Sequence, residues 1–202
     1  MTEPLVTVSS AAVLLPYDNV DTDQVIPARY LKAVTRDGLA EGLFADWRRT
    51  ADGALRPDFP LNRPGVAGRA ILVAGQNFGS GSSREHAVWA LVGNGFRVVI
   101  AGSFADIFRS NAVKNGLLPL QLDERSLADL HETLEARPDA VVSVDLERCE
   151  VTLPGGGTAS FPVDPFARRM LLAGTDELGY LLDHEADIAA WEAAHPAPIS
   201  TR

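Results

Sequence analysis

The feature that most constrains this chain is a glycine-rich stretch, GQNFGSGSSREHA, at residues 75–87. It follows an apolar segment at residues 70–74, which predicts a strand, and it leads into a helical pattern of apolar residues. Glycines let a ligand approach the bare backbone, and the first amides of the following helix point at the same place. Such a place attracts anions. Ser82, Ser83 and Arg84 stand at the end of the loop, where hydroxyls and a guanidinium fork suit a carboxylate.

The same stretch also has a purely structural interpretation. Ser82 and Glu85 have the spacing of a capping box, in which both side chains only close the start of a helix. Three other patterns are excluded. A P-loop is excluded because no Lys followed by Ser or Thr comes after the glycines. A dinucleotide fingerprint is excluded because Arg84 stands where the third glycine is needed. A nucleophile elbow is excluded because neither Ser80 nor Ser82 has the required flanking glycines. Anion binding and helix capping therefore remain the alternatives.

Three segments of the sequence resemble one protein family. GSGSSREH at residues 79–86 resembles the signature of the swivelling domain of the aconitase superfamily, and its continuation to Leu91 is similar to the small subunits of bacterial 3-isopropylmalate dehydratases. VDTDQVIP at residues 20–27 and the run at residues 103–119 are similar to other parts of the same small subunits. The resemblance covers most of residues 13–120, whereas beyond residue 120 only length and general pattern agree.

The expected fold is α/β. Strands and helices alternate in the centre, and hairpin-like strands stand at both ends, which together with the resemblance predicts the three-layer β/β/α swivelling domain. We expect a single domain over residues 1–202, with its core at about residues 13–122, further strands and helices at 123–195, and a frayed tail at 196–202.

Hydrophobic patterning predicts the individual elements. Residues 5–15 read as one or two strands, residues 39–47 as one amphipathic helix, and residues 48–69 as a long irregular connection. A helix at 104–114 is expected to bury Phe104, Ile107, Phe108 and Ala112 on one face. The remaining predicted elements are a strand at 96–101, a helix at 126–136, strands at 141–145, 150–153 and 158–161, a helix at 165–173 and a last helix at 183–194.

Composition excludes several classes of partner. The 202 residues are 46% hydrophobic and carry a net charge of −9 without any long basic cluster, which argues against nucleic acid and anionic membrane surfaces. No stretch approaches the roughly 18 apolar residues of a membrane span, and the first residues lack the features of a signal peptide, so a cytoplasmic location is expected. The single cysteine, Cys149, cannot form an internal disulfide or hold an iron–sulfur cluster by itself. This chain is therefore expected to contain no cofactor.

The family resemblance implies a reaction and a partner. It implies a hydro-lyase that interconverts 2-isopropylmalate and 3-isopropylmalate through 2-isopropylmaleate in leucine biosynthesis. The large subunit of such an enzyme holds a [4Fe–4S] cluster, whose open iron binds the substrate hydroxyl. This chain would be active only with that large subunit, and the substrate would be a small dicarboxylate.

The resemblance also implies roles for individual residues. Ser82 matches the family's base and Asp23 its catalytic aspartate, while Ser83, Arg84 and Gly81 match the substrate-binding part of the loop. A serine is a poor base at its free pKa, so the amides of the loop and the helix start would have to stabilise its alkoxide.

The loop after Asp23 matches the one that contacts the variable group of the substrate. It spans residues 29–34. Leu31 and Val34 favour an apolar branch such as isopropyl, whereas Arg29 leaves room for a related homoaconitase or citraconate hydratase small subunit.

Two alternatives lie outside this reaction class. One is a non-catalytic anion-binding or regulatory module, in which Ser82 is only a helix cap. The other is a serine hydrolase that uses Ser82 with one of the four histidines. Among them His86 lies one turn inside the predicted helix, where a structural role is the more frequent one.

Overall fold

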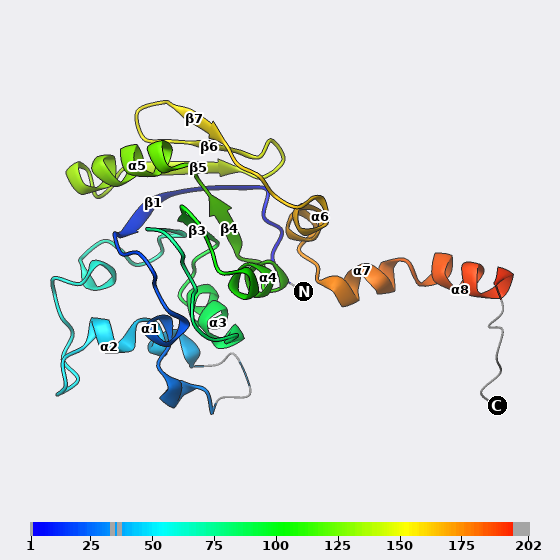
Figure 1. Cartoon of the computed structure of the whole chain (residues 1–202), viewed down its shortest axis with the longest axis horizontal. Helices are drawn as coiled ribbons and strands as arrows, with labels where there is room; N and C mark the ends of the chain where they lie inside the picture. Colours follow the sequence, from blue (N-terminus) through cyan, green and yellow to red (C-terminus); the bar gives the residue numbers. More distant parts are fainter. Residues whose placement is uncertain (1, 33–34, 36–37, 196–202) are drawn as a thin grey trace.

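The computed structural model describes residues 2–32, 35 and 38–195. Its centre is a seven-stranded sheet with the strand order β4-β3-β2-β1-β5-β6-β7 (Figure 1). Strands β1 to β4 pair in parallel, and β5 to β7 continue the sheet as antiparallel strands from the other edge of β1. The strands are β1 (Thr7–Leu15), β2 (Ile71–Ala74), β3 (Val98–Ala101), β4 (Leu118–Gln121), β5 (Val141–Asp145), β6 (Glu150–Thr152) and β7 (Thr158–Ser160).

Strand β1 belongs to both halves of the sheet. Residues 7–11 pair antiparallel with β5, and residues 12–15 pair parallel with β2. Ser9 and Ser10 therefore lie inside one strand and do not separate two. Parallel pairing requires long crossovers, and these contain the helices that cover the sheet, whereas β5 to β7 follow one another through short connections.

Two cores lie on opposite faces of the parallel strands. Leu72 of β2 belongs to the core shared with helices α3 (Glu85–Gly93) and α4 (Asp106–Lys114), because alternate residues of a strand face opposite sides. Ile71 belongs to the second core, together with Val151 of β6 and with helices α5 (Glu124–Ala136) and α6 (Pro165–Ala173). The antiparallel half thus curls over the parallel half (Figure 1). Helices, parallel strands and curled antiparallel strands form three layers, and the predicted β/β/α fold is confirmed.

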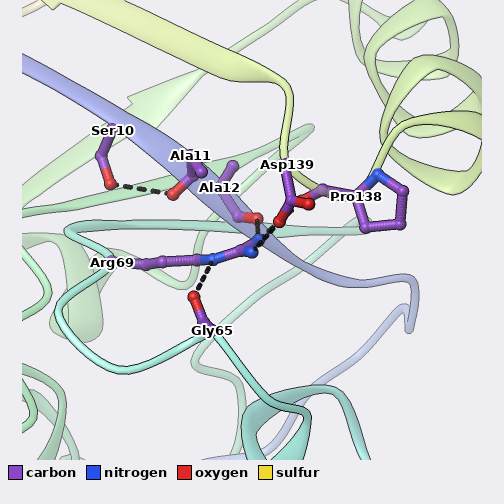
Figure 2. Close-up of polar contacts among 7 residues, drawn as sticks. All are labelled: Ser10, Ala11, Ala12, Gly65, Arg69, Pro138 and Asp139. Atoms are coloured by element: carbon purple, nitrogen blue, oxygen red, sulfur yellow. Dashed lines mark hydrogen bonds and ion pairs between the residues drawn. The ribbon is translucent and has the colours of Figure 1, made fainter.

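Arg69 fixes the corner at which β1 changes partner. Its side chain is 9% exposed, and it donates to the carbonyl oxygens of Ala12 at 2.8 Å, Pro138 at 2.6 Å and Gly65 at 3.1 Å (Figure 2). Its guanidinium also pairs with the carboxylate of Asp139. Four donors of one guanidinium therefore join β1, the connection before β2 and the turn after α5.

The predicted helix at residues 39–47 is wrong. The structure has a 3₁₀ turn, η2 (Leu39–Gly42), and a short helix, α2 (Ala45–Arg48), separated by Phe44 in a left-handed conformation with φ of 49°. Phe44 is fully buried and stacks on Trp47 with 5.7 Å between the ring centroids. The left-handed conformation of Phe44 interrupts the helix, and the periodicity of apolar side chains does not reveal such a conformation.

The predicted irregular connection at residues 48–69 is confirmed. It contains the 3₁₀ turn η3 (Pro60–Asn62) and a bridge between Arg49 and Leu55. Phe59 is 8% exposed and anchors the connection to the first core.

Two predictions about helices need correction. Ile107 is 54% exposed and is not on the buried face of α4. Phe104 precedes that helix, which begins only at Asp106, so the helical spacing from Phe104 to Ile107 does not apply. The predicted last helix at residues 183–194 is confirmed as α8 (Glu185–Ala194), and it is preceded by a helix that was not predicted, α7 (Glu177–Asp183). Both helices extend away from the sheet (Figure 1). The predicted tail at residues 196–202 lies outside the described residues.

Candidate active site

The glycine loop and the second motif lie side by side, although they are about sixty residues apart in sequence. The amide of Thr22 donates to the Ser80 carbonyl at 2.9 Å, and the amide of Gly79 donates to the Val20 carbonyl at 2.8 Å. Gly81 has φ of +89°, and a Cβ at this position would collide with the carboxylate of Asp21. A glycine is therefore required where the two segments touch.

Thr22 holds the main chain of Ser82. It belongs to the short helix α1 (Thr22–Val25) and is 1% exposed. Its hydroxyl accepts a hydrogen bond from the Ser82 amide at 3.2 Å and donates one to the Ser82 carbonyl at 3.1 Å. The sequence analysis did not single out Thr22, and the only available signal was its position between the two aspartates of the second motif.

The capping-box interpretation of Ser82 is wrong. Helix α3 begins at Glu85, and Arg84, not Ser82, occupies its N-cap position, where the Arg84 side chain makes no capping hydrogen bond. Glu85 accepts a hydrogen bond from the Asn115 side chain at 2.7 Å. Ser82 and Ser83 are exposed ahead of the helix, and the Asn111 side chain of α4 donates to the Ser83 carbonyl at 3.5 Å. The N-terminal end of α3, which carries the positive end of the helix dipole, therefore follows directly after two exposed hydroxyls.

Arg84 and Asp23 form an ion pair at the mouth of the loop. The side chain of Arg84 is 20% exposed, and that of Asp23 is 53% exposed. Nη1 of Arg84 is buried, and within the part of the chain that the structure describes it has no hydrogen-bond partner beyond this ionic contact. Asp23 thus holds a partly desolvated guanidinium next to Ser82 and Ser83.

The loop after Asp23 contains a second ion pair. Arg29 contacts Asp46 at 2.7 Å and lies over the ring of Tyr30, with 5.1 Å from the guanidinium carbon to the ring centroid. The hydrogen bond with Asp46 raises the pKa of Arg29. Leu31 is half-buried at the end of the 3₁₀ turn η1 (Ala28–Tyr30), while Val34 lies outside the described residues. Arg29 is thus paired with a residue of α2. Contacts of this loop with a substrate remain predictions.

The histidines give little support to a serine hydrolase. His131 contacts the Ala74 carbonyl at 3.1 Å, and the two histidines of the C-terminal helices, His184 and His195, contact carbonyls within those helices. The ring of His86 packs on Trp89, one turn further along α3, at 4.7 Å between centroids.

Among the described residues, no group of three or more His, Cys, Asp or Glu side chains is placed to hold a metal ion. Over the same residues, every helix is too short or too polar to cross a membrane.

Comparisons with known proteins show the family of the chain. The family described as "Aconitase C-terminal domain" matches residues 2–125, and the family described as "LeuD_N" matches residues 128–165. A 3-isopropylmalate dehydratase small subunit from Chloroflexus aurantiacus is 54% identical over 200 residues, which cover 99% of this chain and 100% of that protein. One from Anaeromyxobacter dehalogenans is 60% identical over 190 residues and covers 94% of this chain and 97% of its own length.

A solved structure shares the fold. The crystal structure of 3-isopropylmalate dehydratase (leuD) from Methanocaldococcus jannaschii matches with a TM-score of 0.66 and 30% identity, over 91% of this chain and 98% of that one. The curled sheet and the glycine loop therefore define an aconitase-type swivelling domain. Within that class, the chain belongs to the family of 3-isopropylmalate dehydratase small subunits.

Proposed function

We propose that this chain is the small subunit of a hydro-lyase that interconverts 2-isopropylmalate and 3-isopropylmalate through 2-isopropylmaleate in leucine biosynthesis. The names of its relatives supply the reaction. The observation that carries the proposal is the junction of two motifs, in which Thr22 holds Ser82 while Asp23 holds Arg84. This junction presents a hydroxyl and a guanidinium together at an exposed edge, as a dicarboxylate requires.

Ser82 is the proposed base. It removes a proton from the carbon next to one carboxylate, the hydroxyl leaves the neighbouring carbon, and a double bond forms between the two carbons. Water then returns with the positions of hydrogen and hydroxyl exchanged, which yields the other isomer. Ser82 can take up the proton only as a stabilised alkoxide, and the positive end of the α3 dipole, which begins three residues further along the chain, favours that negative charge.

Arg84 is the proposed carboxylate ligand, with Ser83 and the main chain at Gly81 beside it. A guanidinium fork binds a carboxylate through two parallel hydrogen bonds, which fixes both the position and the orientation of the substrate. Asp23 orients this fork through the ion pair and so acts on the substrate through Arg84.

The departure of the hydroxyl is assigned to a large subunit. A [4Fe–4S] cluster requires several cysteine ligands, and this chain has only Cys149, so its residues do not fit that cofactor. The inability of one cysteine to form an internal disulfide agrees with the cytoplasmic location that we propose. On this proposal the exposed side of Ser82 and Ser83 is completed by a cluster-bearing partner.

The loop of Arg29, Leu31 and Val34 is the proposed selector of the substrate branch. A half-buried Leu31 suits an isopropyl group. Arg29 pairs with Asp46 of α2, and on this proposal Leu31, not Arg29, contacts the variable branch of the substrate.

Reconstitution tests the proposal. The chain alone is expected to show no turnover of 3-isopropylmalate, and the mixture with an anaerobically reconstituted large subunit is expected to produce the absorbance of the alkene intermediate. The large subunit alone serves as the control. Turnover by the single chain, or a stable complex without turnover, would contradict the proposal.

A further inference from the structure

The C-terminal helices α7 and α8 form an arm with an exposed apolar stripe. The arm leaves the body after α6 and runs away from the sheet (Figure 1). Neither helix contains a buried residue. Five large apolar side chains on the arm are between 39% and 63% exposed, namely Leu178, Leu181, Leu182, Ile188 and Trp191. Their spacings of three and four residues place them along one side of each helix.

Such an arm needs a surface to pack against. Its helices have seven and ten residues, whereas isolated helices shorter than about 12–15 residues are marginal in water. The body contacts the arm at its base, where Lys114 lies 3.8 Å from Glu177. The short length of the two helices and their exposed stripe both indicate a partner that covers them.

The charge of the arm indicates the chemistry of that partner. Residues 177–194 contain five acidic residues and no lysine or arginine. The whole chain has a net charge of −9, so a second copy would repel this arm. A complementary surface is an apolar groove bordered by lysine or arginine side chains.

The arm is also part of the sequence that relatives share. The match with the Chloroflexus aurantiacus small subunit extends over 200 residues, or 99% of this chain, so it includes both helices. The arm is therefore not an extension peculiar to this chain.

We propose that α7 and α8 anchor this chain to the large subunit, by docking into an apolar groove with a basic rim. This inference rests on the proposed function. The anchor keeps the segment of Ser82 and Arg84 at high effective concentration next to the partner's half of the site. Because the arm does not take part in the chemistry, its loss weakens assembly and leaves the rate of the assembled complex unchanged.

The test uses full-length variants. In the arm variant, Leu182→Asp and Trp191→Asp place charges in the stripe. In the control variant, Leu55→Asp introduces a charge on the body of the chain, at an apolar side chain that is 51% exposed. Calorimetry measures the dissociation constant with the large subunit, and the rate is measured as the large subunit is increased. The melting temperatures of the wild type and of the arm variant, each measured without the large subunit, are expected to be equal, because the arm buries none of its residues.

We expect the arm variant to raise the dissociation constant by about 100-fold or more, as loss of buried aromatic and leucine anchors does. Its rate at saturating large subunit should equal that of the wild type. The control should change the dissociation constant by about twofold or less. Glu185→Gln combined with Asp187→Asn should slow association and reduce its dependence on salt.

Three results would overturn the inference. Equal affinity of the arm variant and the wild type would exclude the anchor and leave the proposed function intact. A dimer of the chain alone that the arm variant dissociates would identify a second copy as the occupant. A wild-type chain without affinity for the large subunit would refute the proposed function together with the anchor.

Discussion

At the scale of single residues, the candidate site depends on one buried hydroxyl. Thr22 is 1% exposed, and both hydrogen bonds of its hydroxyl go to the main chain of Ser82. The Ser82 side chain is exposed, so the position of this residue depends largely on the two hydrogen bonds between its main chain and the Thr22 hydroxyl. Thr22 is thus a positioning residue for the proposed base.

Thr22→Val tests this positioning, because valine keeps the shape of threonine and loses both hydrogen bonds. We expect the turnover number of the reconstituted enzyme to fall by about 100-fold, as displacement of a catalytic group by 1 Å can cause. The Michaelis constant should change little, and Thr22→Ser should restore most of the rate. Equal losses in both variants would show that Thr22 acts only through packing.

Arg84→Lys tests the carboxylate ligand. Lysine keeps the charge beside Asp23 and loses the fork, so the Michaelis constant should rise for every dicarboxylate substrate. A rise of about tenfold or more is expected, since a hydrogen bond to a charged group contributes about 1.5–3 kcal/mol. Steady-state kinetics of the reconstituted enzyme measure this change. Unaltered kinetics would reduce Arg84 to a structural partner of Asp23.

The sequence predicted part of this site. Ser82, Ser83 and Arg84 adjoin one another in a recognisable motif, and the resemblance to the aconitase superfamily implied that Asp23 lies beside the serine. The capping box could not be judged from spacing, because it depends on where α3 begins. The structure starts that helix at Glu85, three residues after Ser82.

At the scale of secondary-structure elements, the corner of β1 depends on Arg69. This side chain is 9% exposed and binds three main-chain carbonyls, whereas its carboxylate partner Asp139 has a side chain that is 90% exposed. The carbonyl contacts should therefore contribute more to stability than the ion pair does.

Arg69→Met and Asp139→Asn separate the two contributions. We expect Arg69→Met to reduce the free energy of unfolding by about 3 kcal/mol, because buried carbonyls lose their donors. Asp139→Asn should reduce it by about 1 kcal/mol or less, as is usual for an exposed ion pair. Denaturant unfolding provides both values, and equal losses would contradict this division.

Asp123 caps helix α5 and gives its stability a pH dependence. Hydrogen bonds from the hydroxyl and the amide of Ser126 lower the pKa of the Asp123 carboxyl in the folded chain. Its contribution is therefore present above the ordinary pKa of an aspartate, about 3.9, and is lost as the pH falls through the lower pKa of the folded state.

Asp123→Asn keeps a capping oxygen that does not titrate. Melting temperatures of the wild type should therefore fall more than those of the variant as the pH is lowered below about 4. Parallel curves over that range would show that the carboxylate of Asp123 has no part in the acid sensitivity of the fold.

Most elements followed from hydrophobic patterning, and the clearest exception has a cause in tertiary packing. The helix at residues 165–173 begins and ends as predicted, because Asp164 and Pro165 mark its start and Gly174 its end. The region at residues 39–47 failed because Phe44 adopts a left-handed conformation while fully buried. Such conformations depend on tertiary packing, which local periodicity does not report.

At the scale of the whole molecule, the curl of the sheet brings together residues far apart in sequence. Ile71 and Val151 belong to the same core, although the sequence around either residue does not predict contact with the other. The order of the predicted strands and helices, together with the resemblance to a family, predicted this three-layer architecture. The sequence analysis predicted α8 and missed α7, a helix of seven residues that buries none of them and contains Gly179, a poor helix former.

The proposed mechanism depends on Ser82 as the base, and one comparison tests that role most directly. Ser82→Ala and its neighbour control Ser83→Ala are each assembled with the large subunit, and turnover is measured at saturating substrate. Ser82 does not cap α3, so Ser82→Ala should melt and assemble like the wild type. It should lose about 10²–10⁴-fold in rate, as removal of a general base does, whereas Ser83→Ala should mainly raise the Michaelis constant. If Ser82→Ala keeps more than about a tenth of the wild-type rate, another group takes the proton and the proposed mechanism is wrong.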